Sequence, residues 1–494
     1  MKRVVIIGAG PAGLTAAYQL SKLGLRPIVL EKGSRVGGLA RTENYRGYRV
    51  DIGGHRFFTK VGEVGTLWRE VLGADLLTRP RLSRIYYGGK FIVYPLRFAD
   101  ALSRLGLIES ARIVLSYLRS GIFPYRHENT FEEWVSNRFG RRLFELFFKS
   151  YTEKVWGIPC DQISAQWAAQ RIRGLSLPRA MWNAVFAQRD GTVKTLIQQF
   201  EYPRLGPGML WERVAEMVEA RGGVVRLNTE VTRALHRSGR VTDVAVCVDG
   251  REDVIACDAV ISSMPIGELV AKLDPPAPED VRAPAGRLAY RDFISVALIV
   301  NRAEVFPDNW IYVHAPDVRV ARIQNFKNWS PDLVADPAKT CLGLEYFCTV
   351  EDVLWRLSDA DLIRLGAAEL EKIGLVKSSE IEDGAVFRQP KAYPVYTGEY
   401  AAYLTSIRSF LDSLSNLQTV GRNGLHMYNN QDHSMLTAML AVRNLFGEMH
   451  DVWSVNVERA YHEEMRVPSV AQSEPSSRVN RQVISGVEPA PADS

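Results

Sequence analysis

The chain has 494 residues and a mass of 55.4 kDa, a length that corresponds to about three domains. Hydrophobic residues make up 46% of it and charged residues 24%, proportions that exclude a fibrous repeat and a wholly disordered chain. A net charge of +5 over this length is too weak for a protein that coats nucleic acid, so we expect no nucleic-acid partner.

The N-terminus predicts a strand, a helix and a second strand. Residues 4–7 are all apolar, as expected for a parallel strand that is buried on both faces. Residues 12–23 form a helix with an apolar side, which Gly24 would end. Residues 27–30 form the next strand, closing on Glu31. This is a βαβ unit.

The rest of the chain divides by pattern into helical and strand-rich stretches. Residues 62–191 are predicted to be mostly helical, and a further helix is predicted over 209–220. Short strands are expected from 224 to 260, of which 259–261 resembles a buried strand that returns to the first sheet. Further strands are predicted at 292–300, 310–313, 320–325, 342–349 and 417–420, and helices at 359–373 and 434–446.

The turn after the first strand predicts a dinucleotide site. It reads Gly-Ala-Gly-Pro-Ala-Gly from Gly8 to Gly13 and opens the first helix. Gly8 allows the tight turn, Gly10 lets the backbone approach a pyrophosphate, and Gly13 lets the helix press on the strand. The helix N-terminus offers free N–H groups to the phosphates, and Glu31 is expected to accept hydrogen bonds from ribose hydroxyls.

A second glycine cluster, Gly37-Gly38, and then Arg41 follow the ribose-binding carboxylate. This order resembles FAD enzymes of the glutathione-reductase and amine-oxidase superfamily. The resemblance shifts the expected cofactor from NAD to FAD and implies that Arg41 lies beside the FAD phosphates.

Two later segments are candidates for binding. At 51–57, two glycines precede His55, which lets the backbone approach something flat or charged, although a structural histidine remains an alternative. At 421–434, a polar strand-turn-helix contains Arg422, whose guanidinium can fork onto phosphates. The helix start at 432–434 offers amides to a flavin or phosphate, with a simple N-cap at Asp432 as the alternative.

Together these segments resemble the UDP-galactopyranose mutases, more closely their eukaryotic-type branch than the usual bacterial one. The Asp-Ile-Gly-Gly-His loop at 51–55 and the Asn-Gln-Asp-His-Ser block at 430–434 match in order. Between them the matching islands are residues 154–159 with Trp167 and Arg171 beyond, Trp310-Ile311-Tyr312 followed by Arg322 and residues 328–331, and Tyr393-Pro394.

The resemblance implies a role for each matching residue. Arg322 and Arg422 would clamp the substrate diphosphate, and His55 would lie on a mobile loop beside the flavin ring, which makes these three the candidate catalytic residues. The substrate-binding side chains would be Trp156, Arg171, Tyr312, Arg322, Tyr393, Arg422, Tyr428 and Asn430. The flavin would contact Gly8, Gly10, Pro11, Ala12, Gly13, Glu31, Lys32, Gly38, Leu39, Arg41, Gly53, Gly54, His55, Val231, Gly421, Arg422, Asn430, Gln431 and Ser434.

The resemblance also implies a reaction. N5 of reduced FAD would attack the anomeric carbon of a nucleoside diphosphate hexose, and the sugar would reclose through another hydroxyl, which interconverts pyranose and furanose without net redox change. NADPH or NADH is the expected reductant. Departures from the family at Thr152, 199–203 and 428–430 leave the sugar and the nucleotide open.

Two other interpretations compete with this one. The first is a redox flavoenzyme like protoporphyrinogen oxidase, phytoene desaturase or amine oxidase, for which Lys391 is the candidate lysine beside flavin N5. An arginine- and tyrosine-lined pocket argues against its apolar substrates. The second is a flavin-binding protein without activity.

The expected fold is therefore α/β, with a Rossmann-like FAD-binding domain of GR2 type, an inserted helical domain and an antiparallel-sheet substrate domain. The boundaries predicted are 1–61, 192–265 and 416–465 for FAD binding, 62–191 for the helical insertion, 266–415 for the substrate sheet and 466–494 for a disordered tail. Five cysteines without Cys-x-x-Cys or metal-ligand spacing indicate reduced thiols, no metal site and a cytoplasmic protein. No stretch reaches the roughly 18 apolar residues of a membrane span. The expected partner is a small nucleotide sugar, and homo-oligomerisation is left open.

Overall fold

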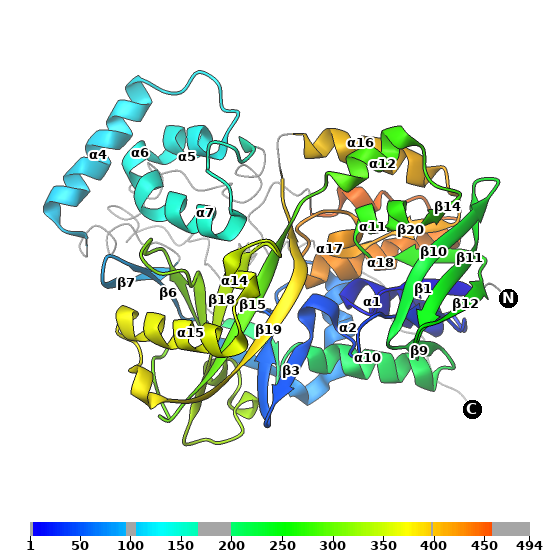
Figure 1. Ribbon diagram of the computed structural model, residues 1–494, viewed down its shortest axis with the longest axis horizontal. Helices are drawn as coiled ribbons and strands as arrows, with labels where there is room; N and C mark the ends of the chain where they lie inside the picture. Colours follow the sequence, from blue (N-terminus) through cyan, green and yellow to red (C-terminus); the bar gives the residue numbers. More distant parts are fainter. Residues whose placement is uncertain (1–2, 95–104, 166–198, 397–398, 457–494) are drawn as a thin grey trace, which may run out of the picture.

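The computed structural model describes residues 3–94, 105–165, 199–396 and 399–456 (Figure 1). A five-stranded parallel sheet forms the centre of one half of the molecule. Its order is β20 (Leu417–Thr419), β13 (Ala259–Ser262), β1 (Val4–Ile7), β2 (Ile28–Leu30) and β9 (Val224–Arg226). The predicted return of residues 259–261 to the first sheet is confirmed, because β13 pairs in parallel with β1.

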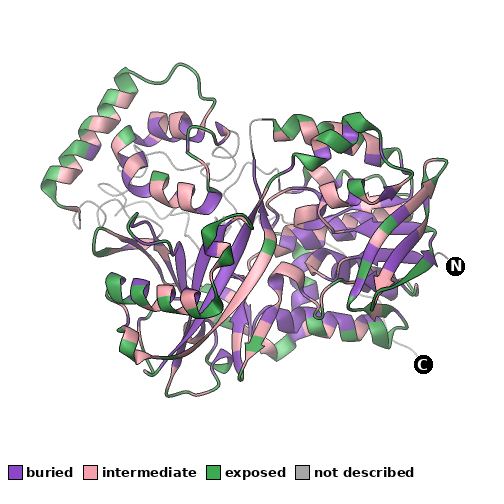
Figure 2. Cartoon of the chain, in the orientation of Figure 1, coloured by how far each residue is buried: buried purple, intermediate pink, exposed green. Residues whose placement is uncertain are grey.

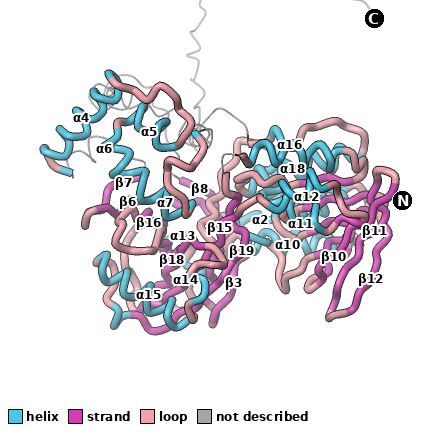
Figure 3. The backbone as a smooth tube through the Cα atoms, turned by 45° about the horizontal axis from the view of Figure 1, so that its top comes forward, coloured by secondary structure: helices cyan, strands magenta, loops and turns pink. Residues whose placement is uncertain are grey.

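Both faces of this sheet are covered, which explains why β1 is apolar throughout. On one face pack α1 (Pro11–Lys22), α2 (Gly62–Leu72), α10 (Gly208–Ala220) and α18 (Gln431–Leu445). On the other lies an antiparallel hairpin set of β10 (Thr229–Arg237), β11 (Arg240–Val248) and β12 (Arg251–Ala256), with β14 (Leu273–Asp274) parallel to β10. The helices α11 (Ile266–Ala271), α12 (Glu279–Gly286) and α16 (Tyr400–Asp412) gather beside it (Figure 3).

A seven-stranded sheet forms the other half. Its order is β19 (Ile381–Pro394), β15 (Tyr290–Val300), β18 (Thr340–Cys348), β17 (Arg322–Asn325), β16 (Trp310–Val313), β6 (Ser83–Tyr87) and β7 (Lys90–Tyr94). All neighbours are antiparallel except β16 and β6. One face packs on α15 (Asp359–Ile373), and the edge strand β19 lies nearest to the parallel-sheet half (Figure 1). The predicted α/β fold with a parallel sheet and antiparallel sheets is confirmed.

Helices cap the β6–β7 end of this sheet. They are α4 (Leu107–Ile122), α5 (Phe131–Phe139), α6 (Arg141–Phe144) and α7 (Ser150–Trp156), with a π-helical turn at Glu145–Lys149. The prediction that 62–191 is mostly helical was wrong for residues 76–94, which form β5 (Leu76–Pro80), β6 and β7. The missed signal is Gly88-Gly89, which turns with positive φ at both positions between two alternating strands.

The remaining elements are short. They are the hairpin β3 (Thr42–Tyr45) and β4 (Tyr48–Asp51), β8 (Gln199–Pro203) paired with β5, the helices α13 (Phe326–Trp329), α14 (Val353–Arg356) and α17 (Gly421–Gly424), and 3-10 turns at Gly38–Ala40, Gly73–Asp75, Pro331–Leu333, Ser378–Glu380 and Val452–Ser454.

Buried residues concentrate in the two sheets and in the faces that their helices turn toward them (Figure 2). None of the described helices has the length and apolar character needed to cross a bilayer. The predicted tail at 466–494 lies outside the described residues, and the predicted domain boundaries stay predictions.

Candidate functional site

The turn between β1 and α1 has the shape of a phosphate cradle. Gly8 has φ +95°, and a Cβ on Gly13 would lie 1.9 Å from the carbonyl oxygen of Gly8. Only glycine therefore lets α1 approach β1 this closely. No side chain of the described residues caps the start of α1 at Gly10, so the first-turn N–H groups are left for an anion.

Glu31 is held at the end of β2 beside this turn. Its Oε2 accepts a hydrogen bond of 2.8 Å from the Ala9 N–H, and its Oε1 accepts one of 2.8 Å from the Gly33 N–H. Each oxygen keeps a lone pair for a ribose hydroxyl. Val231 of β10 is buried in the same apolar cluster as β2, whereas Lys32 is exposed.

The second glycine cluster closes on the first. A Cβ on Gly38 would lie 3.1 Å from the Cα of Gly10, so the two loops touch through their backbones. Arg41 donates to the Gly38 carbonyl at 3.0 Å, and its Nε lies 2.6 Å from Oε1 of Glu43. The guanidinium predicted to meet phosphates is therefore near the cradle, but its charge is shared with a carboxylate. Leu39 packs against the apolar cluster that contains buried residues of α4, α5, α6 and α7.

The C-terminal segment returns to the same place. A Cβ on Gly421 would lie 3.0 Å from Cβ of Ala12, at the start of α1. The N-cap of α18 is Asn430, in a capping box with His433, so the alternative of Asp432 as the cap was wrong. Gln431 accepts a hydrogen bond of 3.0 Å from Nε1 of Trp211, and Ser434 is buried in the first turn. The start of α17 and the start of α1 are thus neighbours, and α17 is tied to α18 by the hydrogen bond of 3.0 Å from the Gly421 N–H to Oγ1 of Thr437.

Arg322 stands in a row of paired residues across the seven-stranded sheet. In the strand pairing, Arg322 lies opposite Tyr312 on β16 and opposite Glu345 on β18. The Arg322 Nε lies 2.6 Å from Oε2 of Glu345, whose side chain is fully buried, and Nη2 donates to the Tyr393 hydroxyl at 3.1 Å. Although burial alone lowers the pKa of Arg322, the carboxylate of Glu345 and the surrounding tyrosines raise it well above its ordinary value. Arg322 is therefore a permanent cation.

The ring of Tyr393 joins the two candidate arginines. The Cζ of Arg322 lies 6.0 Å from its centroid, and that of Arg422 lies 5.3 Å from it. Tyr428 stacks on Tyr393 with centroids 5.4 Å apart and lies 4.8 Å from the Arg422 Cζ. The backbone carbonyls of Asn429 and Ala392 accept from Arg422 at 2.9 and 3.1 Å. Within the described residues, no carboxylate forms an ion pair with Arg422, unlike Arg322.

His55 lies within the electrostatic reach of both arginines. Burial, and then the positive charges of Arg422 and Arg322, lower its pKa to about 3, so the imidazole is neutral. The loop that carries it leaves no room for a side chain at Gly54, because a Cβ there would lie 2.1 Å from the ring of Trp310. The backbone of Gly54 also hydrogen-bonds to Glu345, which ties the histidine loop to Arg322.

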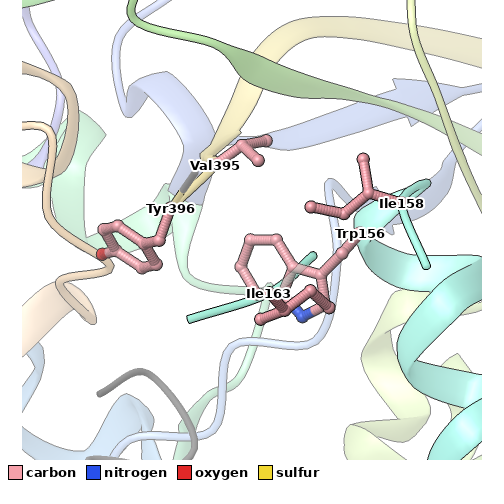
Figure 4. Close-up of a pocket in the computed structure, with 5 residues that line it drawn as sticks. All are labelled: Trp156, Ile158, Ile163, Val395 and Tyr396. Carbon is pink, nitrogen blue, oxygen red and sulfur yellow. The ribbon is translucent and has the colours of Figure 1, made fainter. Parts of the chain in front are cut away.

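Trp156 lines a small apolar pocket on the helical side of this cluster. The pocket is formed by Trp156, Ile158, Ile163, Val395 and Tyr396 (Figure 4). Ring centroids of Trp156 and Tyr428 are 6.4 Å apart, so the pocket adjoins the arginine–tyrosine cluster. Trp167 and Arg171 lie outside the described residues.

Lys391, the candidate of the competing oxidase interpretation, contacts a different set of groups. Its ammonium pairs with the carboxylate of Glu268 on α11 and lies 5.8 Å from the ring centroid of Tyr290. Neither partner belongs to the arginine–tyrosine cluster.

Several residues of the cluster were not predicted: Trp310 and Phe347, which flank the Arg322 guanidinium, and Gln324 and Glu345, which bind each other at 2.6 Å. One signal was present for Glu345. It is a lone acid in the apolar strand Thr340–Cys348, and a carboxylate buried there needs a cationic partner.

Residues 11–433 match the sequence model of the family described as flavin containing amine oxidoreductase. A probable UDP-galactopyranose mutase of Klebsiella pneumoniae is 27% identical over 177 residues, which are 33% of this chain and 43% of that protein. The chain matches about half or less of the length of its first curated relatives.

Two solved structures resemble the chain over almost its whole length. Reduced UDP-galactopyranose mutase has a TM-score of 0.80 at 21% identity, covering 93% of this chain and 96% of its own. A putative protoporphyrinogen oxidase from Exiguobacterium has a TM-score of 0.67 at 21% identity, covering 90% and 98%. At this identity the likeness establishes a shared fold.

Proposed function

The chain belongs to the flavin-containing amine oxidoreductase family, and from this premise we propose that it is an FAD-dependent nucleotide-sugar mutase. It would interconvert the pyranose and furanose forms of a nucleoside diphosphate hexose such as UDP-galactose. Its placement near the eukaryotic-type branch of the UDP-galactopyranose mutases, and NADPH or NADH as reductant, are parts of this proposal.

The described residues fit FAD. The cradle leaves no room for a side chain at Gly8 or Gly13, and the start of α1 has free N–H groups. Glu31 is fixed beside it, where it can bind a ribose. The start of α17 lies against the same cradle through Gly421 and Ala12. When bound, reduced FAD supplies the nucleophile for the anomeric carbon, so no nucleophilic side chain is needed.

One observation carries the proposal: the guanidinium groups of Arg322 and Arg422 both lie near the ring of Tyr393. The neutral imidazole of His55 is within the electrostatic influence of both. A diphosphate that leaves a sugar gains negative charge, and fixed guanidinium groups stabilise that charge. The carboxylate of Glu345 neutralises the charge of Arg322, whereas the charge of Arg422 is not neutralised. The cluster therefore has a net positive charge that suits an anion. The hydroxyl of Tyr393 already lies within hydrogen-bond distance of Arg322 and can donate to a phosphate oxygen.

The same cluster disfavours the oxidation of amines. An ammonium substrate would have to approach two guanidinium groups, and like charges brought together cost several kcal/mol. A neutral apolar substrate would leave those groups without partners. The competing oxidase interpretation is supported by the family and by the structural likeness to a putative protoporphyrinogen oxidase.

The decisive experiment uses the purified flavoprotein under anaerobic conditions. The flavin is reduced with dithionite, UDP-galactofuranose or UDP-galactopyranose is added, and the two sugars are separated by chromatography. We expect interconversion with no consumption of reductant beyond the initial reduction. Turnover that needs oxidised flavin and an electron acceptor would refute the mutase and favour the oxidase.

The nucleotide and the sugar can be narrowed by binding alone. A ligand that binds only the folded protein raises its unfolding temperature, and the rise grows with the logarithm of the ratio of ligand concentration to Kd. A panel of nucleoside diphosphate hexoses, with the free sugars and nucleoside monophosphates as controls, is expected to single out one diphosphate sugar. Equal protection by all nucleotides would contradict a specific donor pocket.

A further inference from the structure

The helix α4 turns its apolar side to the solvent. At about 100° per residue, its exposed large apolar side chains fall within an arc of about 100°. These are Leu107, Ile108, Leu115, Leu118 and Ile122, and their exposed fractions are 91%, 75%, 66%, 54% and 70%. Phe123, directly after the helix, is 76% exposed. We call this set the outer stripe.

The inner side of α4 combines polar contacts with the apolar side chains of Ile113 and Tyr117. Ser116 accepts a hydrogen bond of 3.0 Å from the Arg142 backbone N–H of α6, and Gly140 packs against the backbone of Tyr117. Ile113 is the one residue of the described helix that is buried. A surface helix normally buries its apolar residues, but α4 buries only Ile113 and part of Tyr117 and leaves the outer stripe exposed. An exposed apolar patch of this extent marks a docking surface.

The helix lies at the outer edge of the molecule, as Figures 1 and 2 show. Figure 2 colours the ribbon of α4 mostly as exposed or intermediate. The stripe is therefore accessible to something large and flat.

The charges beside the outer stripe are positive. Arg112 and Arg119 follow Ile108 around the helix and line one edge of the stripe. The acidic residue of α4, Glu109, faces inward to Arg142 and also lies 3.5 Å from Arg112. Arg126, just beyond the helix, adds a further cation.

An apolar stripe edged by arginines favours one kind of binding partner over another. A second copy of the chain, pairing stripe to stripe, would bring like-charged arginines together, which is unfavourable. An anionic lipid surface accepts both features, because the apolar side chains enter the acyl boundary while arginine stems reach phosphates. We propose that α4 docks this protein on membranes that contain anionic phospholipid, lying on the surface without crossing it.

The test is sedimentation of the full-length flavoprotein with vesicles. Vesicles of phosphatidylcholine that contain phosphatidylglycerol are compared with pure phosphatidylcholine, at low and at high salt. We expect sedimentation with the anionic vesicles, weakened by salt and weaker on neutral ones. The variant Leu115→Glu/Leu118→Glu is expected to lose sedimentation, and Arg112→Ala/Arg119→Ala to weaken it roughly 30-fold.

Matched controls come from other surfaces. Val353 of α14 is an apolar side chain with 72% exposure, and Val353→Glu is expected to leave binding unchanged. Arg282→Ala/Arg364→Ala removes two exposed arginines that, like Arg112, pair with an acid three residues away. This pair is expected to bind like the wild type. The unfolding temperature of each variant shows whether it is folded.

Three outcomes would overturn the proposal. One is that the wild type fails to bind anionic vesicles at low salt. Another is that the folded Leu115→Glu/Leu118→Glu variant binds as well as the wild type. The third is that light scattering shows a wild-type dimer that this variant converts to monomers while vesicles bind neither, which would assign the stripe to a second copy. None of these readouts depends on the activity of the enzyme, so they fail or succeed independently of the proposed function.

Discussion

Arg322 and Glu345 stand opposite each other on β17 and β18, and their side chains form a buried ion pair of 2.6 Å. The carboxylate is also bound by the side chain of Gln324 and by the backbone of Gly54. A buried charge is tolerated when its remaining positions are satisfied in this way. Glu345 therefore fixes the direction of Arg322 and anchors the loop that carries His55.

The substitution Glu345→Gln should expose both roles. It keeps the shape but leaves Arg322 as an unpaired buried cation, so we expect the free energy of unfolding to fall by about 3 kcal/mol. A misdirected guanidinium should also lower mutase turnover about 100-fold. The matched control is Glu380→Gln, whose carboxylate pairs with Arg302 at 3.1 Å at a half-exposed site. There the loss should stay below about 1 kcal/mol, and equal losses at the two sites would contradict the role of Glu345.

Arg322→Ala and Arg422→Ala should both abolish turnover, by a factor of about 100 to 1,000, while the protein stays yellow. Their stabilities should differ. Arg322→Ala strands the Glu345 carboxylate and should cost about 3 to 5 kcal/mol, whereas Arg422 is bound by backbone carbonyls and strands no charge. Denaturant unfolding and flavin absorbance measure the two effects. Release of flavin from the Arg422 variant would mean that its role is to hold the cofactor.

Gly54→Ala should disturb the histidine loop through the ring of Trp310. The new Cβ would lie 2.1 Å from that ring, and overpacking of this kind costs about 1 to 3 kcal/mol. We expect a lower unfolding temperature together with reduced turnover. Gly62→Ala at the start of α2 is the control, since a Cβ there meets no atom within 4 Å. A neutral effect of Gly54→Ala would show that the loop does not pack on Trp310.

His55 should not titrate near neutral pH. Its pKa is lowered to about 3, below the ordinary 6.5, by burial and then by Arg422 and Arg322. A lowered histidine pKa gives stability that is present above about pH 6.5 and is lost as the pH falls toward 3. In NMR spectra of histidine-labelled protein, with His55→Gln for assignment, the His55 signal should stay constant from about pH 5 to 8. A midpoint near 6.5 would place the ring in solvent.

Asp51, at the end of β4, should show the opposite dependence. Thr42 donates to it at 2.8 Å and Tyr202 donates as well, yet burial raises its pKa from 3.8 to about 7. The folded state then binds the proton more tightly, so the stability from this group is full below about pH 4 and is lost as the pH rises to 7. Relative to Asp51→Asn, the wild type should lose up to about 1.4 kcal/mol per pH unit in that window. Parallel stability curves for the two proteins would contradict this pKa.

The sequence predicted those parts of the fold that depend on local pattern. The strand β1, the turn at Gly8 and the carboxylate of Glu31 follow from apolar runs and glycine spacing. The strand β19 was missed because Gly384 and Pro390 interrupt its alternation. Such residues are tolerated there because β19 is the edge strand of its sheet.

The partners of the candidate arginines could not be predicted from local pattern. Arg322 meets Glu345 only because three strands align in one register, which a one-residue slip would destroy. The resemblance to a family pointed to Arg322, Arg422 and Tyr393, but the carboxylate that fixes Arg322 depends on contacts far apart in the sequence.

The central parallel sheet takes its strands from residues 4–7 at one extreme and 417–419 at the other. On the ribosome, the glycine turn is made well before β20 and α18, and at typical synthesis rates roughly 20 to 80 seconds separate them. Throughout that interval the nascent protein presents a half-built cleft and exposed apolar strands to chaperones. A chain that ends before residue 417 would lack β20 and α18, so we expect it not to retain flavin.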